Sequence, residues 1–161
     1  MIEKLQNKDI KIAEKIRAVF QVSYKVEAKL LNAIDFPPLK RPIEEYVNCS
    51  NHFFGFLKDK ELAAVVEIIH NEEYTHIRSL VVNPAFFKQG IASKLMEFVL
   101  NTFDSSLFVV ETGVNNGPAS ALYKKFHFKE VKQWETDHGI RKIKFERIMN
   151  TDASKKTRCN V

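Results

Sequence analysis

A short stretch around Gly90 has the composition of an anion-binding turn. Lys88, Gly90, Ala92 and Ser93 open an expected helix, and no acidic residue lies among them. The first turn of a helix presents free N–H groups and the positive end of the helix dipole, so natural helices usually place acids there. A helix start that is small, basic and free of carboxylates suits an anion supplied from outside, such as a phosphate.

The residues on either side of this turn predict the two elements that position it. Residues 80–82 are strand formers, and Pro84 ends that strand. Beyond Gly90, apolar side chains recur at helical intervals, at Ile91, Leu95, Phe98 and Val99. We therefore expect a buried strand, a short turn and an amphipathic helix over residues 80–96.

Strand and helix patterns continue along most of the chain. Expected strands, identified by alternation and flanking turn residues, cover 2–6, 51–58, 62–71, 74–82, 107–112, 131–136 and 140–148. Expected helices, identified by apolar spacing and start signals, are one or two across 9–33, a short one after Pro42, one over about 88–101 and one over 118–126. Strands in runs with only two later helices predict an α+β fold, with a mixed, largely antiparallel sheet and flanking helices.

The composition is that of one ordinary globular domain. Of the 161 residues, 45% are apolar and 28% are charged, and the net charge of +5 arises at the C-terminal end. We expect one domain over 1–149 and a mobile, polar, basic tail over 150–161. No apolar run is long enough to span a membrane, the N-terminus is too polar for a secretory signal, and Cys49 and Cys159 are far apart. These features predict a cytoplasmic protein with free thiols.

Several other chemistries lack the motifs that they require. His70 and His76 flank a turn rich in metal-ligand residue types, but their spacing is not that of two histidines on one face of a zinc-binding helix. No phosphate-binding loop of the Gly-Lys-Ser/Thr kind occurs, and no serine or cysteine lies in a nucleophile motif. The sequence therefore predicts no metal site and no covalent intermediate.

Two spaced motifs resemble those of the GCN5-related N-acetyltransferases (GNAT). The first is Gln or Arg, any two residues, Gly, any residue, then Gly or Ala, and it falls on residues 87–92. The second is Asn, Ala three positions later, and then Leu-Tyr, and it falls on Asn116, Ala119, Leu122 and Tyr123. Because both lie in order on the expected elements, the chain is identified as a member of this superfamily over about residues 2–148, with its acyl-CoA N-acyltransferase fold.

Two positions depart from the family pattern. Phe87 stands where the first motif usually has Gln or Arg, so we expect a polar contact to be lost there and Lys88 and Gln89 to compensate for it. His127 stands where the family usually has Gly before Phe, so we expect it to end the preceding helix in a left-handed conformation at some cost.

The resemblance implies acetyl-CoA as the cofactor. Backbone N–H groups of residues 88–93 would point at its diphosphate, and Gly90 would let the backbone approach closely. The pantetheine arm would pair with the backbone of residues 80–82, in a gap where this strand and the strand over 107–112 splay apart. Asn116 would hydrogen-bond that arm, cap its own helix, or do both. The expected cofactor-binding residues are Leu80, Val81, Val82, Lys88, Gln89, Gly90, Ile91, Ala92, Ser93, Asn116, Ala119 and Tyr123.

The resemblance also implies that a primary amine attacks acetyl-CoA directly in a ternary complex. Tyr123 would be the general acid for the departing thiolate, and an N–H near Val82 would stabilise the oxyanion. For the general base, Glu111, Glu67 and solvent all stay open. Glu111 precedes Tyr123 by twelve residues, similar to the spacing of the base glutamate in ribosomal-protein N-terminal acetyltransferases, whereas Glu67 lies within the apolar run 63–69.

Two other functions stay open. A non-catalytic acyl-CoA-binding module would explain Phe87, and an RNA- or ribosome-associated protein would explain the basic residues of 141–161, although no nucleic-acid motif accompanies them. We expect the acceptor to be a small-molecule amine or a peptide or protein N-terminus, and polyamines, aminoglycosides, free amino acids and protein N-termini all stay open. We expect its site within 32–50 and 132–140, with aromatic walls from Phe36, Tyr46 and Trp134. A homodimer is common in the superfamily.

Overall fold

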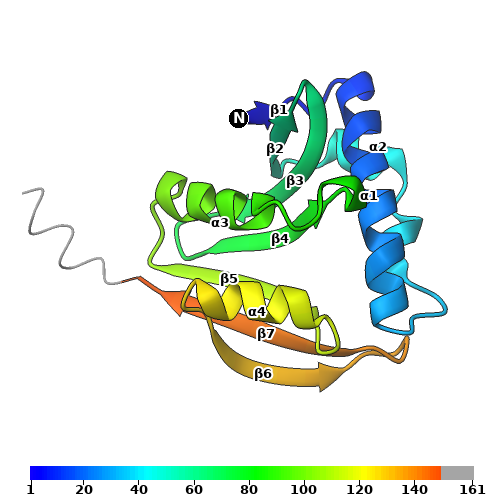
Figure 1. Cartoon of the computed structure of the whole chain (residues 1–161). Helices are drawn as coiled ribbons and strands as arrows, with labels where there is room; N and C mark the ends of the chain where they lie inside the picture. The colour runs from blue at the N-terminus through cyan, green and yellow to red at the C-terminus, as the bar shows by residue number, and fades with distance from the viewer. Residues whose placement is uncertain (150–161) are drawn as a thin grey trace, which may run out of the picture.

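Seven strands form one mixed sheet in the order β1-β2-β3-β4-β5-β7-β6, and the computed structural model describes residues 1–149 (Figure 1). The strands are β1 (Ile2–Leu5), β2 (His52–Lys58), β3 (Glu61–His70), β4 (Thr75–Val82), β5 (Leu107–Gly113), β6 (Lys129–Glu135) and β7 (Arg141–Ile148). Every neighbouring pair is antiparallel except β4 and β5, which run parallel. This arrangement confirms the expected α+β fold with a mixed, largely antiparallel sheet.

Helices cover both faces of this sheet. They are α1 (Ile10–Leu30), α2 (Ile43–Asn48), α3 (Ile91–Thr102) and α4 (Gly117–Lys125), with two 3-10 turns, η1 (Pro37–Lys40) and η2 (Pro84–Phe86). Successive side chains of a strand point to opposite faces. Val82 packs in the core shared with α3 and α4, whereas Val81 packs in the core shared with α1 and α2. The sheet therefore separates two cores, one under each pair of helices (Figure 1).

The long helix α1 starts at a capped turn and follows the apolar spacing of the sequence. The side chain of Asp9 accepts a hydrogen bond from the N–H of Lys11, which satisfies one of the free donors of the first turn. Ile16 and Phe20 are fully buried against the sheet. The region expected as one or two helices is thus a single helix, and the chain leaves it through Asn32, whose φ of 50° is left-handed.

The β2–β3 hairpin closes through a two-residue turn. Asp59 and Lys60 have positive φ angles of 50° and 68°, which is the geometry of a type I′ turn. That turn matches the right-handed twist of its flanking strands. The hairpin expected from the sequence is therefore confirmed, and β4 extends it by pairing with β3.

One extra residue interrupts the pairing of β3 with β4. Glu67 pairs with Ser79, and the next pair along the ladder is Ile68 with Ile77. Arg78 is therefore the unpaired residue of a β-bulge. A bulge re-aims the side chains around it, and here Ile77 packs in the core under α3 and α4 while Ser79 faces α1.

The turn before α3 differs from its expected form. Lys88 and Gly90 have φ angles of 62° and 74°, in the left-handed region, so the helix begins at Ile91 rather than near residue 88. Glycine adopts this conformation at no steric cost, and Gly90 forms the N-cap of α3. Because Gly90 has no capping side chain, the first N–H groups of α3 stay available.

The end of α4 agrees with the sequence. His127 has a φ of 66°, and the N–H of Phe128 donates to the carbonyl of Tyr123 at 3.0 Å. This is the geometry of a left-handed helix end. The prediction that His127 takes the position of the usual glycine is confirmed.

The mobile tail expected over 150–161 and the free thiol expected at Cys159 lie outside the described residues. Within 1–149, Cys49 is a free thiol. No helix of the described part is long and apolar enough to cross a membrane.

Candidate active site

The parallel strands β4 and β5 separate after three paired positions. Thr75, His76 and Ile77 pair with residues 108–110 of β5, and the pairing does not continue beyond them. From Ser79 onward, β4 has an unpaired edge on the side of β5, and the two strands diverge (Figure 1). An open edge offers backbone N–H and C=O groups to an extended ligand. The expected splay between these strands is confirmed.

A groove of about 430 Å³ lies at this gap, between the start of α3, the helix α4 and the last turns of α1. We call it the α3–α4 groove. It contains every residue expected to bind the cofactor except Val81, namely Leu80, Val82, Lys88, Gln89, Gly90, Ile91, Ala92, Ser93, Asn116, Ala119 and Tyr123. Val81 is buried in the core under α1 instead. Phe87 also lines the groove, with 43% of its surface exposed.

The start of α3 gives one end of the groove the features of an anion site. A Cβ built on Gly90 would meet nothing within 4 Å, and the first turn of α3 contains no acid. Lys125 donates to the hydroxyl of Ser93 at 3.1 Å, and Lys58 contacts the side chain of Gln89. Bare N–H groups, open space and flanking cations fit a ligand that bears a diphosphate.

A small space, which we call the passage, lies between this groove and the opposite face of the sheet and shares lining residues with both. It has a volume of about 60 Å³ and lies between Leu80 of β4 and residues 110–112 of β5. Tyr123 lines both the passage and the groove, and its ring packs against Phe128 and Phe145, with ring centroids 6.0 and 5.8 Å away. Its hydroxyl has no hydrogen-bond partner among residues 1–149. Burial raises the pKa of the phenol, and the charge of Glu27 raises it further, so the phenol keeps its proton.

Asn116 joins α4 to α1 at the mouth of this passage. Its Oδ1 accepts from the N–H of Ala119 at 3.2 Å, so the expected capping role is confirmed. Its Nδ2 donates to Oε1 of Glu27 at 3.3 Å. Burial raises the pKa of Glu27, although the hydrogen bond from Asn116 and the charge of Lys142 oppose the increase. Glu27 is the residue that lines the groove, the passage and the cavity described next.

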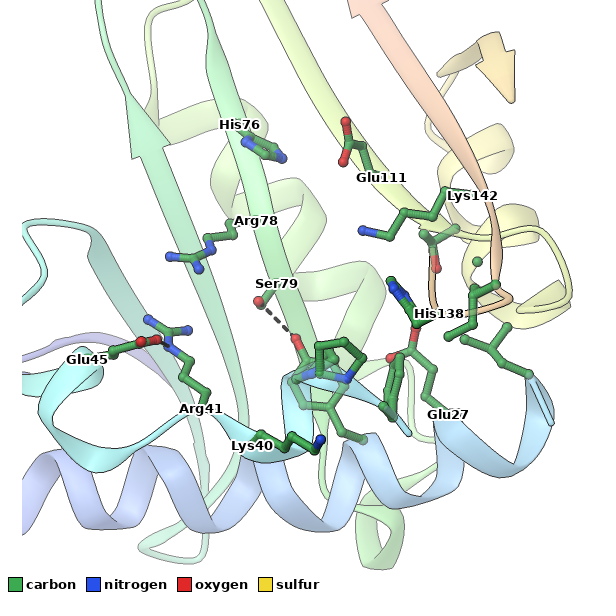
Figure 2. Close-up of a pocket in the computed structure, with 18 of the residues that line it drawn as sticks. Glu27, Lys40, Arg41, Glu45, His76, Arg78, Ser79, Glu111, His138 and Lys142 are labelled. Atoms are coloured by element: carbon green, nitrogen blue, oxygen red, sulfur yellow. Dashed lines mark hydrogen bonds and ion pairs between the residues drawn. The ribbon is translucent and has the colours of Figure 1, made fainter. Parts of the chain in front are cut away.

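A cavity of about 510 Å³ opens on the face of the sheet toward α1 (Figure 2). We call it the α1-side cavity. The two segments expected to form an acceptor site both contribute to it, the first through Phe36, Pro37, Pro38, Lys40, Arg41, Pro42 and Glu45 and the second through His138 and Ile140. The sheet contributes His76, Arg78, Ser79, Glu111, Thr112, Gly113 and Lys142. The hydroxyl of Tyr24, on α1, donates to Oγ of Ser79 at 3.0 Å.

Of the three aromatic residues expected to line the acceptor site, Tyr46 and Trp134 lie outside the α1-side cavity. Phe36 lines the cavity and packs edge-on against Tyr24, with ring centroids 5.8 Å apart. Tyr46 is fully buried in the core under α1, where the guanidinium of Arg41 lies 4.1 Å from its ring centroid. Trp134 is on β6 and packs against Lys132, outside the cavity. The aromatic wall is therefore formed by Phe36 and Tyr24.

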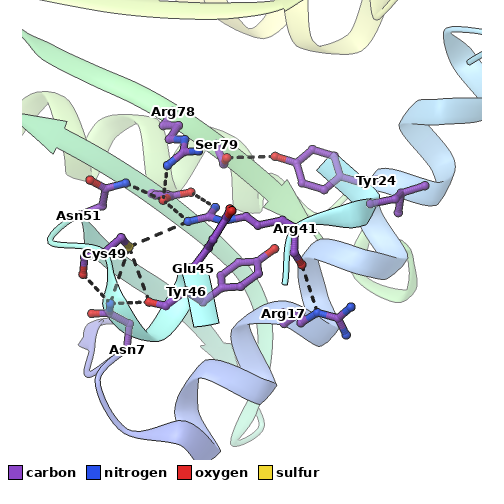
Figure 3. Close-up of polar contacts among 12 residues, drawn as sticks. Asn7, Arg17, Tyr24, Arg41, Glu45, Tyr46, Cys49, Asn51, Arg78 and Ser79 are labelled. Atoms are coloured by element: carbon purple, nitrogen blue, oxygen red, sulfur yellow. Dashed lines mark hydrogen bonds and ion pairs between the residues drawn. The ribbon is translucent and has the colours of Figure 1, made fainter. Parts of the chain in front are cut away.

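The two carboxylates considered as a base have different surroundings. Glu111 lines both the α1-side cavity and the passage, and points into the cavity in Figure 2. Glu67 is fully buried and lines none of the three spaces. Arg41 binds both oxygens of Glu67, at 2.8 and 2.9 Å, and Asn51 donates to Oε2 at 2.8 Å (Figure 3).

These contacts give Glu67 a structural role. Burial opposes its ionisation, but the hydrogen bonds from Arg41 and Asn51 and the charges of Arg41 and Arg78 lower its pKa overall. A carboxylate that is held ionised and already bonded on both oxygens is a weak proton acceptor. The geometry therefore favours Glu111 over Glu67 as a base.

Sequence reasoning missed several residues around the passage, above all Tyr24, Glu27 and Ser79. Glu27 had a detectable signal, because it lies seven residues after Phe20 and so falls near the apolar stripe of α1. An acid at such a position must face either a partner or a cavity. Ser79 had no such signal, since its direction depends on the bulge at Arg78.

Comparison with known proteins identifies similar sequences. Residues 17–128 match the family model described as the acetyltransferase (GNAT) family. The chain is 31% identical over 141 residues to the UPF0157 protein YqkA of Bacillus subtilis, a match that covers 87% of this chain and 41% of that protein. The chain spans less than half the length of the curated relatives that it matches.

Solved structures with the same fold include two acetyltransferases. The ribosomal-protein-S18-alanine N-acetyltransferase of Escherichia coli superposes with a TM-score of 0.73 at 16% identity, over 92% of each chain. The PaiA N-acetyltransferase of Thermoplasma acidophilum, in complex with coenzyme A, superposes with a TM-score of 0.68 at 17% identity, over 92% of this chain and 99% of that chain. At these identities the likeness shows a shared fold.

Proposed function

Because the chain belongs to the acetyltransferase (GNAT) family, we propose that it transfers the acetyl group of acetyl-CoA to a primary amine, by direct attack in a ternary complex. One observation carries this proposal. The α3–α4 groove and the α1-side cavity lie on opposite faces of the sheet and meet at the passage beside Tyr123. Two reactants that enter from opposite faces would bring their reacting atoms together there.

The α3–α4 groove would bind acetyl-CoA by its diphosphate and its pantetheine arm. The N–H groups of residues 88–93 would donate to the diphosphate, and Gly90 leaves room for the close approach. The unpaired edge of β4 at residues 80–82 would pair with the amides of the arm, and Asn116 lies beside that path. The PaiA enzyme, which shares this fold and contains coenzyme A, supports the assignment.

Acetyl-CoA supplies a thioester carbonyl that a neutral amine can attack. A backbone N–H near Val82, on the open edge of β4, would donate to the carbonyl oxygen as charge develops there. The acceptor arrives as an ammonium ion, so its nitrogen loses one proton before it attacks and a second proton as the N–C bond forms and the C–S bond breaks. Glu111 would take one of them to solvent, and Glu27 is a second carboxylate at the same passage. Tyr123 would donate its phenol proton to the departing thiolate, and the second proton from the nitrogen would restore the phenol.

The acceptor would enter through the α1-side cavity. Its volume of about 510 Å³ suits a small-molecule amine or the N-terminus of a peptide. The S18-alanine N-acetyltransferase, by its name, acts on a protein substrate, which supports the second class. Both classes share one requirement, a primary amine that reaches the passage.

Two measurements test the proposal. Isothermal titration should detect acetyl-CoA binding, and the release of free thiol from acetyl-CoA should depend on an added amine. If millimolar acetyl-CoA produces neither heat nor thermal stabilisation, the proposal is wrong. Binding without thiol release over a broad panel of amines would instead favour a non-catalytic acyl-CoA-binding module, which the apolar Phe87 in the groove also supports.

A further inference from the structure

The α1-side cavity contains charges of both signs around one apolar wall. Glu111 comes from β5, Arg78 from the bulge of β4, and Lys142 from β7 (Figure 2). Burial lowers the pKa of His76, although the charge of Glu111 opposes this, so the imidazole is neutral at pH 7. The cationic side of the cavity therefore depends on arginine and lysine.

Several charged residues of the cavity are already bound to protein partners. Arg41 holds both oxygens of the buried Glu67, and Lys40 forms an ion pair with Asp35. Glu45 lies 3.9 Å from Nε of Arg41. The charge of Arg41 is neutralised by the buried Glu67, whereas Lys40 and Glu45 are exposed and their ion pairs are screened by water.

Three other charged residues of the cavity have fewer protein partners, namely Arg78, Lys142 and Glu111. Within residues 1–149, Lys142 and Glu111 form no ion pair. Arg78 reaches Oε2 of Glu67 with one nitrogen only, at 3.5 Å, and 43% of its side chain is exposed. A guanidinium has five donors in a planar fork, so most of those of Arg78 stay available. The cavity thus offers the cations Arg78 and Lys142 to a ligand, together with the carboxyl groups of Glu111 and Glu27.

An apolar surface completes the cavity. Leu31, Phe36 and Ile140 form a small buried cluster at its base, and Tyr24 packs against the edge of Phe36. A ligand that fits would have an amine for the passage, an anionic group for the two cations and an apolar body for this wall.

We propose that the acceptor is a free amino acid with an apolar side chain, bound through its carboxylate by Arg78 and Lys142. This inference rests on the proposed function and specifies its acceptor. A carboxylate forms strong, charge-assisted hydrogen bonds with a guanidinium and an ammonium group. The N-terminus of a peptide has no carboxylate beside its amine, and a polyamine would bring additional positive charge toward both cations. The free amino acid matches both signs of charge.

The test compares acceptors that share a side chain and a primary amine but differ in the carboxylate, with each kcat/KM calculated for the neutral amine because the amine pKa differs among them. Leucine, leucinamide and 3-methylbutylamine share one side chain and one primary amine, and methionine and phenylalanine give parallel sets. We expect kcat/KM for the free amino acid of at least one set to exceed that of its amide and its decarboxylated amine by about tenfold or more, the effect of one charged hydrogen bond. Equal use of the three compounds in every set would overturn the inference.

Variants then locate the carboxylate site. Lys142→Met and Arg78→Met should each lower kcat/KM for the amino acid about tenfold and leave the values for the amide and the amine within about twofold. Lys25→Met is the matched control, because Lys25 is exposed on α1 and lines none of the three spaces. Arg78→Met alters a contact of buried Glu67, so if it fails to fold, Lys142→Met gives the answer alone. An equal loss for all three compounds contradicts the proposed site.

A binding measurement separates this inference from the proposed function. If no amine releases thiol although acetyl-CoA binds, transfer is not the function, and titration of each amino acid into protein saturated with coenzyme A then tests the cavity. Binding of the amino acid that is about tenfold tighter than that of its decarboxylated amine, and is lost in Lys142→Met, supports the carboxylate site. No preference, or no binding of any free amino acid, overturns it.

Discussion

Asn116, at the N-cap of α4, donates a hydrogen bond from Nδ2 to Oε1 of Glu27 on α1, 3.3 Å away and 89 residues earlier in the chain. The amide has one orientation available, because its oxygen accepts from the N–H of Ala119. One residue therefore caps a helix and fixes a carboxylate at the passage between the two proposed binding spaces. The contact joins two helices that are far apart in the sequence at the point where we propose that the reaction occurs.

Isosteric variants identify the proton acceptor. Glu111→Gln or Glu27→Gln should lower kcat/KM by about 10²–10⁴ if that carboxylate is the base, and the acidic limb of the pH–rate profile should disappear with it. The amide oxygen introduced by Glu27→Gln would still accept the hydrogen bond from Asn116, so a loss in this variant reports basicity rather than geometry. Glu14→Gln, an exposed site on the same helix, is the control. If neither passage variant alters the profile, solvent takes the proton.

Glu27→Gln should also stabilise the protein at alkaline pH. Burial raises the folded-state pKa of Glu27 above its usual value of 4.5, so the ionised form is disfavoured by folding. Its contribution to stability is greatest below pH 4.5 and decreases as pH rises through the folded-state pKa. We expect the Tm difference between Glu27→Gln and the wild type to be positive at pH 8 and smaller at pH 4. A lower Tm for the variant at pH 8 would show that the hydrogen bond to Asn116 outweighs the burial.

Tyr123→Phe should separate turnover from cofactor binding. The ring would keep its contacts with Phe128 and Phe145, and the hydroxyl has no partner to lose within residues 1–149. We expect kcat to fall about 10²-fold or more, as for loss of a general acid, while the Kd of acetyl-CoA changes less than about threefold. Tyr74→Phe, which lies outside all three spaces, is the matched control. Unchanged turnover in Tyr123→Phe would remove the acid from the mechanism.

Gly90→Ala should weaken acetyl-CoA binding without a clash inside the protein. A Cβ has open space at both Gly90 and Gly117, but only Gly90 has a left-handed φ. Alanine there costs about 1–2 kcal/mol of backbone strain, and its methyl group would occupy the surface proposed for the diphosphate. We expect Kd to rise at least about tenfold by isothermal titration, whereas Gly117→Ala should bind normally. Equal affinity in the two variants would place the diphosphate elsewhere.

Local patterns in the sequence were sufficient to predict most of the fold and the residues that line the α3–α4 groove. The apolar spacing after Gly90 and the motif at Asn116 predicted the residues that now line the α3–α4 groove, because each motif lies within one turn and one helix. The side chain of Val81 faces α1 because side chains alternate along β4, and the pairing expected for residues 80–82 involves their backbone. The start of α3 was placed too early because spacing does not reveal the left-handed φ of Lys88.

The other side of the site depends on contacts that no local pattern contains. Lys142 and Glu111 face one cavity because β5 and β7 pair in the sheet, although about 30 residues separate them in sequence. Tyr46 looked like a ligand-binding aromatic in an irregular segment, yet it fills the core beside Arg41. Whether a side chain in a connecting segment faces a cavity or the core is decided by tertiary packing, and sequence spacing does not report it.

Two ion pairs with similar contact distances differ in burial, so comparing them tests how burial changes the contribution of an ion pair to stability. The shortest contact of Arg41 with Glu67 is 2.8 Å, and that of Arg141 with Glu135 is 2.7 Å. Glu67 is fully buried, whereas the side chains of Arg141 and Glu135 are 47% and 67% exposed. Arg41→Met should cost about 3–5 kcal/mol at pH 7, because it leaves a buried carboxylate without its main partner. Arg141→Met should cost less than about 1 kcal/mol, since water screens an exposed pair.

The pH dependence of Arg41→Met shows whether its loss of stability comes from the charge of Glu67. The folded-state pKa of Glu67 lies below its usual value of 4.5, so its stabilising contribution is present above pH 4.5 and is lost as pH falls through the folded-state pKa. The difference in unfolding free energy between wild type and Arg41→Met should therefore be largest near pH 7 and shrink as the pH is lowered below 4.5. Urea unfolding at several pH values measures it. A difference that stays constant with pH would mean that Arg41 stabilises the fold through its packing on Tyr46 rather than through its charge.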